Sequence, residues 1–139
     1  MYAREMSNDL SPSRPSLERL NRKYDRIARA LTAAVLCFEE RSQYAWAIRA
    51  IDDWIEWSGR RPRKEAVASA VRVLAKRYRG QELIMLVTKV LNIPPHDNNI
   101  GEKAFDDSEY TYEKAIYTES INALHKSGLY EEADQLYAE

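Results

Sequence analysis

Apolar residues recur at helical spacing along most of the 139-residue chain. Between residues 17 and 38 they follow alternating steps of three and four, which places them on one face of a helix. The members of this stripe are Leu17, Leu20, Tyr24, Ile27, Leu31, Val35 and Phe38. The same spacing returns over 44–55, 67–78, 116–124 and 130–137. The sequence therefore predicts a series of amphipathic helices, the first of them capped by Ser16.

Short polar or glycine-containing stretches separate these segments and predict turns at 39–43, 58–59, 79–80 and 127–128. The apolar run from Leu83 to Leu91 has the length of a strand, but helical patterns on both sides and the lack of a partner strand favour a helix. We expect a flexible arm over residues 1–15 and a helical-repeat domain over 16–139. Its hairpins are predicted at about 29–62, 65–93 and 115–139, with an acidic loop over 94–113.

The composition fits a single all-α domain. Only four glycines and five prolines are present, which disfavours an all-β chain with many hairpin turns. The longest apolar runs are too short to span a membrane, and no secretory signal pattern opens the chain. The single cysteine, Cys37, excludes an intrachain disulfide, and its place beside Phe38 predicts a small core residue.

The helical hairpin repeats along the sequence. When Tyr130 is aligned with Tyr44, Ala133 falls on Ala47 and Leu124 falls on Phe38. An offset of 36 residues relates the first copy to the second, so that Val35 meets Val71 and Phe38 meets Leu74. A period near 35 indicates stacked helical hairpins, each too small to bury its own apolar face. Ala47 and Ala133 are predicted to lie where the two helices of a hairpin cross closely.

The third copy resembles the pentatricopeptide repeat. Its apolar-aromatic start, the Ser-Gly turn at 127–128 and the Glu-Glu-Ala run at 131–133 carry the resemblance, and the first copy closes similarly at 56–62. The second copy departs from this pattern, because Tyr78 stands where the turn glycine is expected. The related tetratricopeptide repeat is a second resemblance.

The resemblance implies a fold and a function. The fold is a right-handed α-α superhelix, or solenoid, of about three helix-turn-helix repeats. The function is binding of single-stranded RNA in a chloroplast or mitochondrion, without catalysis, in support of RNA processing, splicing or translation. In this family a residue of the first helix and a residue at the repeat's end face the base. The resemblance places Ser69, Lys64 and Glu119 at such positions, with Ala33 as the first copy's equivalent.

Charge divides the chain into two halves. Residues 1–80 carry 17 basic and 10 acidic residues, whereas residues 81–139 carry 4 and 12. Eight cations gather between residues 60 and 79 against one acid, Glu65. The candidate RNA-phosphate ligands among them are Arg60, Arg61, Arg63, Arg72, Lys76 and Arg77. The competing interpretation is a solvated helix face that pairs with the acidic loop or tail.

Catalytic patterns are weak. His96 and His125 lack metal-ligand spacing, and no glycine-rich phosphate loop is present, so we expect neither an enzyme nor a cofactor. Trp54 and Trp57 are predicted to pack in the core, while Trp46 lies beside the apolar face and is the candidate for RNA stacking. The alternative function is a protein-protein adaptor or structural subunit of a larger organellar assembly, which docks its partner through the acidic loop 94–113.

Overall fold

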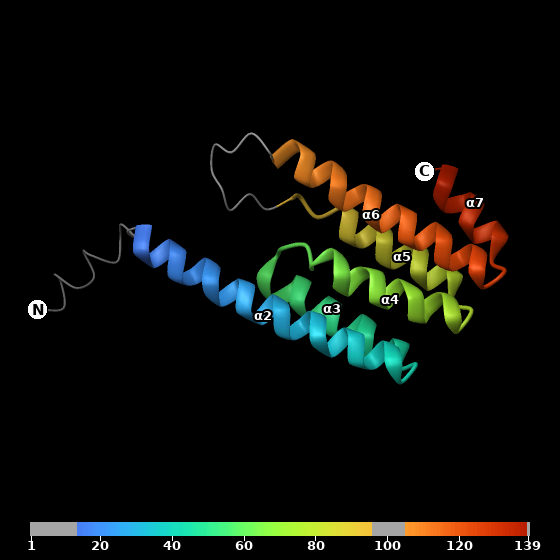
Figure 1. The fold of residues 1–139 in the computed structure, drawn as a ribbon, viewed down its shortest axis with the longest axis horizontal. Helices are drawn as coiled ribbons and strands as arrows, with labels where there is room; N and C mark the ends of the chain where they lie inside the picture. The colour runs from blue at the N-terminus through green and yellow to red at the C-terminus, as the bar shows by residue number, and fades with distance from the viewer. Residues whose placement is uncertain (1–13, 96–104, 139) are drawn as a thin grey trace, which may run out of the picture.

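The computed structural model describes residues 14–95 and 105–138, and its regular structure within these ranges is entirely helical (Figure 1). The helices are α2 (Arg14–Glu40), α3 (Tyr44–Ser58), α4 (Lys64–Lys76), α5 (Gly80–Leu91), α6 (Phe105–Lys126) and α7 (Tyr130–Ala138). The all-α prediction is confirmed. The apolar run that ends at Leu91 is a helix, as its neighbours indicated.

The helices form three antiparallel hairpins that stack in chain order. Helix α2 packs on α4, and α4 packs on α6, so these three first helices lie side by side. The second helices α3 and α5 each contact the first helix of the following hairpin, and α5 also contacts α7. One core runs through the stack and includes Val35, Ile51, Val67, Val71, Leu74, Leu83, Val87, Leu124 and Leu136. Because α4 lies between two neighbours, it is the most thoroughly buried helix.

The three hairpin turns share one backbone geometry. Each contains a residue with positive φ: Ser42 at 56°, Tyr78 at 60° and Gly128 at 79°. The N–H of the next residue then donates to a carbonyl five residues earlier, which closes the first helix as a Schellman-type cap. These bonds join Gln43 to Phe38 (2.9 Å), Arg79 to Leu74 (2.8 Å) and Leu129 to Leu124 (2.8 Å). The equivalence of Phe38, Leu74 and Leu124 deduced from the sequence is therefore confirmed.

Tyr78→Gly is expected to raise the free energy of unfolding by about 1 kcal/mol, because glycine occupies the left-handed region without the steric cost of a side chain. The Tyr78 ring is 71% exposed, so its removal sacrifices little packing. Urea denaturation followed by circular dichroism measures the change. As a matched control, Gly128→Ala should destabilise by a similar amount, since only the φ angle opposes a side chain there. A destabilised Tyr78→Gly variant would contradict this account of the turn.

Several boundaries and burial predictions differ from the structure. Helix α2 begins at Arg14, within the predicted arm, and α6 begins at Phe105, so the later part of the predicted loop 94–113 is helical. Ile116 and half-buried Tyr112 pack against the core and hold this end of α6. Residues 1–13 and 96–104, the rest of the predicted arm and loop, lie outside the described residues.

Cys37 and Trp57 were expected in the core, but both are exposed, and only Trp54 is buried. Cys37 lies on a face of α2 that the other described helices leave exposed. Trp57 lies against Tyr24 and Trp54 at the edge of the first hairpin, with ring centres 5.1 and 5.8 Å away.

Candidate nucleic-acid interface

The predicted phosphate ligands divide into cations engaged within the fold and cations free to meet solvent. Arg61 belongs to the first group, since its side chain is only 9% exposed. It donates to the carbonyls of Ile93 (2.7 Å) and Leu91 (3.0 Å) at the end of α5. Its guanidinium also lies 5.2 Å from the Tyr112 ring centre and 3.6 Å from the Glu113 carboxylate. Arg61 thus connects the α3–α4 connector to α5 and α6 and is a structural residue.

Arg60 and Arg63 bind the outer part of α2. The Arg60 guanidinium lies 3.9 Å from the centre of the Tyr24 ring and within 3.5 Å of the Asn21 amide oxygen. Arg63 forms an ion pair with Asp25. Both arginines are partly exposed, and both hold the connector against the helix.

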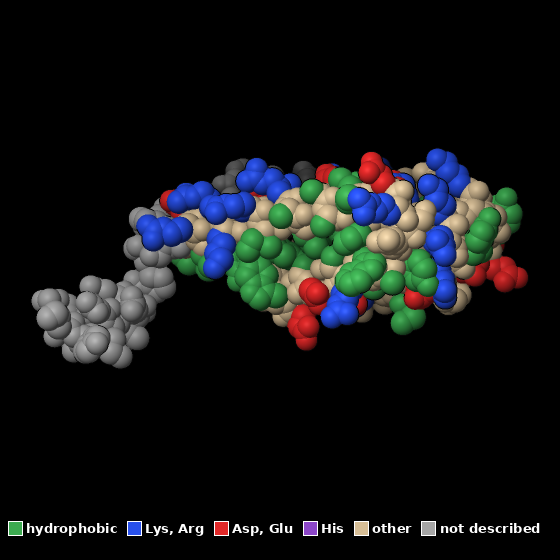
Figure 2. Space-filling view, turned by 90° about the horizontal axis from the view of Figure 1, so that it is seen from below, with side chains coloured by type: hydrophobic (Ala, Val, Ile, Leu, Met, Phe, Trp, Pro, Cys, Tyr) green, Lys and Arg blue, Asp and Glu red, His purple; other side chains and the backbone are tan. Residues whose placement is uncertain are grey.

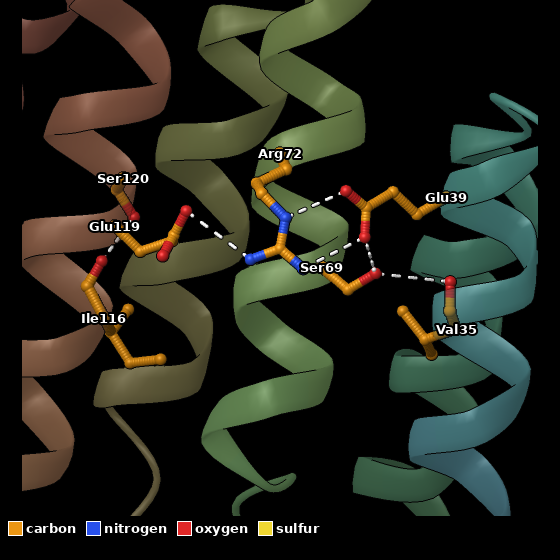
Figure 3. A network of polar contacts seen from close by, with 7 residues as sticks. All are labelled: Val35, Glu39, Ser69, Arg72, Ile116, Glu119 and Ser120. Atoms are coloured by element: carbon orange, nitrogen blue, oxygen red, sulfur yellow. Dashed lines mark hydrogen bonds and ion pairs between the residues drawn. The ribbon is translucent and has the colours of Figure 1, made fainter.

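Arg72 lies at the centre of a polar network that crosses all three first helices (Figure 3). Its Nε and Nη2 donate to both carboxylate oxygens of Glu39 on α2, at 2.8 and 3.0 Å. Its Nη1 lies 3.5 Å from Glu119 on α6. Ser69 donates to the same Glu39 carboxylate at 2.6 Å. Burial alone would raise the pKa of Glu39. The hydrogen bonds from Arg72 and Ser69 oppose this effect and together outweigh it, so the pKa of Glu39 lies below the ordinary value of 4.5.

The three base-facing candidates have different surroundings. Ser69 is fully buried and turned toward α2, where the Glu39 carboxylate accepts a hydrogen bond from its hydroxyl. Glu119 is half-buried and faces Arg72. Lys64 is exposed at the first residue of α4, and Ala33 is exposed on α2 without a polar side-chain atom. In this arrangement Ser69 and Glu119 bind residues of neighbouring hairpins. Of the three base-facing candidates, Lys64 is therefore the one whose polar group is exposed to solvent.

One group of accessible cations gathers at the hairpin turns. The three turns lie at one end of the molecule, at the right in Figure 1. Exposed basic side chains there form what we call the basic turn cluster: Arg41, Lys76, Arg77, Arg79 and Lys126. Figure 2 shows basic side chains gathered at this end.

Aromatic rings lie within the basic turn cluster. Arg77 donates to the Ser42 carbonyl (3.4 Å), which joins the first two turns. The guanidiniums of Arg77 and Arg79 lie 5.8 and 4.9 Å from the Tyr44 ring centre. Exposed Tyr78 stands between them in sequence. Cations interleaved with aromatic rings can contact both the phosphates and the bases of a single strand.

Arg41 and Lys126 of this cluster were missed because each lies outside the dense run of charge at 60–79. An alignment of the three repeats identifies both residues. An offset of 36 residues places Arg41 at the turn position of Arg77, and an offset of 50 places Lys126 at that of Lys76. A cation cluster spread over three repeats is visible only after the repeats are aligned.

The chain matches no family model, no curated protein and no solved structure in the comparisons. Among the described helices, none has the length and apolar character needed to cross a membrane. Within residues 14–95 and 105–138, no group of acidic, histidine and cysteine side chains is arranged to hold a metal ion. The polar networks and the basic turn cluster are therefore the evidence for function.

Proposed function

We propose that this chain is a non-catalytic helical-repeat protein, similar to short pentatricopeptide proteins, that binds single-stranded RNA in a chloroplast or mitochondrion. In this proposal the stacked hairpins are a short right-handed superhelix that assists RNA processing, splicing or translation. The observation that carries it is the basic turn cluster, in which five exposed cations lie at one end of the stack and two of them, Arg77 and Arg79, lie near the Tyr44 ring.

We assign phosphate binding to the basic turn cluster and not to the whole set of arginines and lysines predicted from the sequence. Lys76 and Arg77 remain phosphate ligands, joined by Arg41, Arg79 and Lys126. Arg61 and Arg72 are excluded, because binding an external phosphate would cost them their partners inside the fold. Since the contacts are mainly to phosphate, affinity is expected to depend strongly on salt and weakly on base sequence.

Fluorescence anisotropy with a labelled, unstructured RNA of about 20 nucleotides tests the proposal at about 50 and about 200 mM salt. The triple variant Lys76→Gln, Arg77→Gln, Arg79→Gln should bind about tenfold more weakly at the lower salt, and its salt slope should fall by about 2. These side chains are exposed, so the helices should remain intact.

A matched control removes the same charge elsewhere. Arg19, Arg22 and Lys23 are exposed on the first turns of α2, and their triple glutamine variant should retain most of the parent affinity. Equal loss in both variants would show that net charge, and not the basic turn cluster, governs binding. No binding of the parent chain at low salt would overturn the RNA proposal and favour the alternative, a protein adaptor that docks through residues 94–113.

A further inference from the structure

Tyr78 occupies a backbone conformation that is unfavourable for its side chain. Its φ of 60° lies in the left-handed region, where every residue except glycine meets a steric cost. The equivalent positions of the other two hairpin turns hold the small residues Ser42 and Gly128. The turn therefore forms without an aromatic side chain, and the ring of Tyr78 needs another explanation.

Packing within the fold does not supply that explanation. The Tyr78 side chain is 71% exposed. Within residues 14–95 and 105–138 its hydroxyl has no hydrogen-bond partner, and no other ring or guanidinium lies against its ring. Exposed Trp46, in contrast, lies beside Phe38 with ring centres 6.4 Å apart. A residue in a strained conformation that gains little from packing is typical of a binding site.

The neighbours of Tyr78 in the chain are cations that leave its ring open. Arg77 and Arg79 are both exposed, and their guanidiniums lie 5.8 and 4.9 Å from the centre of the Tyr44 ring. Figure 2 shows hydrophobic side chains, a class that there includes tyrosine, among the basic side chains at this end of the molecule. Because the two guanidiniums lie against Tyr44, the faces of the Tyr78 ring remain available to a ligand.

A strand bound by these arginines passes close to Tyr78. Consecutive Cα atoms lie about 3.8 Å apart, so phosphates held by Arg77 and Arg79 are within a side chain's length of the Tyr78 ring. Tyr44 is less suited to a base, because it is half-buried against the core and already lies under two guanidiniums. Bases stack on aromatic side chains when they are unpaired and can turn out of their own stack.

We propose that Tyr78 stacks on an unpaired base and that this contact makes the basic turn cluster prefer a single strand to a duplex. This inference rests on the proposed function and adds a base contact to its phosphate contacts. Every base has a face that can stack, so one ring selects unpaired bases without reading their sequence. The steric cost at the turn is then the cost of presenting the ring between two phosphate-binding arginines.

Fluorescence anisotropy tests the proposal with three labelled RNA probes of about 20 nucleotides: an unstructured single strand, its duplex and an abasic single strand. Tyr78→Gly should bind the normal single strand at least about fivefold more weakly than the parent. Its salt slope should equal that of the parent, because no charge is lost. The duplex and the abasic strand should bind the parent and the variant equally, since neither offers a free base.

The same variant separates binding from folding. Because Tyr78→Gly is expected to be more stable than the parent, its weaker binding cannot arise from unfolding, and circular dichroism verifies its helix content. Tyr78→Phe should bind like the parent, since it keeps the ring. Tyr78→Leu should bind like the glycine variant, because it keeps an apolar side chain at the same φ but has no aromatic face.

Tyr137 provides a matched control elsewhere on the surface. Its side chain is 80% exposed and lies on α7, whose acids are Glu131, Glu132 and Asp134. Tyr137→Ala removes an exposed ring from a place that repels phosphate, so this variant should bind the single strand like the parent.

The outcomes distinguish this inference from the proposed function. If the parent binds the single strand and Tyr78→Gly binds it equally well, base stacking by Tyr78 is wrong and the phosphate-binding proposal stands. An equal loss in Tyr137→Ala, or a loss in Tyr78→Gly that also occurs with the abasic strand, would likewise overturn the inference. A parent that binds none of the three probes at low salt would overturn both proposals.

Discussion

Arg61→Met is expected to lower the free energy of unfolding by about 3 kcal/mol, because the substitution removes a buried cation that two backbone carbonyls require. The carbonyls of Leu91 and Ile93 lie at the end of α5, where a helix has no further amide donors of its own. The negative end of the helix dipole adds to the attraction for the guanidinium. Methionine fills a similar volume but donates no hydrogen bond, so the loss reflects polar contacts more than packing.

Urea denaturation followed by circular dichroism measures this effect. Arg60→Met is the matched control, since the contacts of neighbouring Arg60 are with the side chains of Tyr24 and Asn21 on α2 and not with the carbonyls at the end of α5. It should cost less than about 1 kcal/mol. Similar losses in the two variants would show that charge near the connector, and not the bonds to α5, stabilises the fold.

Arg72→Met is expected to cost about 2 kcal/mol at neutral pH, because it leaves the Glu39 carboxylate partly buried without its cation. It should also change the pH dependence of stability. The pKa of Glu39 is lowered in the folded state, so its contribution is present above the ordinary value of 4.5 and is lost as pH falls through the folded-state pKa. Without Arg72, that loss on acidification should become smaller.

Free energies of unfolding measured from neutral pH to about pH 3 test both parts of this prediction. Glu119→Gln is an informative control, because Glu119 is more exposed and its oxygen lies 3.5 Å from Arg72. It should leave most of the acid dependence in place, since it preserves the Glu39 pair. An unchanged acid dependence in Arg72→Met would contradict the assignment of this effect to Glu39.

Local periodicity explains why the helices and the repeat could be predicted from sequence. Phe38, Leu74 and Leu124 recur at positions that the turn hydrogen bonds confirm. Even the turn at Tyr78, which lacks the expected glycine, has the backbone geometry of the others. Backbone hydrogen bonds and helix packing impose this geometry, so the side chain at the turn is a poor guide to it.

The roles of the charged residues could not be predicted, because their partners are distant in sequence. Arg72 meets Glu39, which lies 33 residues earlier, and Arg61 meets Ile93, which lies 32 residues later. A dense basic run therefore divides into structural arginines and accessible cations only after folding. Burial on the first hairpin was missed for a similar reason, because Cys37 and Trp57 lie on helical stripes whose neighbours are known only from the assembled stack.

The polar network around Arg72 has a consequence for the order in which the fold opens. Because one arginine contacts both α2 and α6, the middle hairpin cannot unfold without breaking polar contacts to both of its neighbours. In contrast, α7 has nine residues, of which Ala133 and Leu136 are buried, and among the described helices it contacts only α5 and α6 substantially. Local opening should therefore begin at α7, and the amide protons of α4 should exchange with solvent only when the whole domain unfolds.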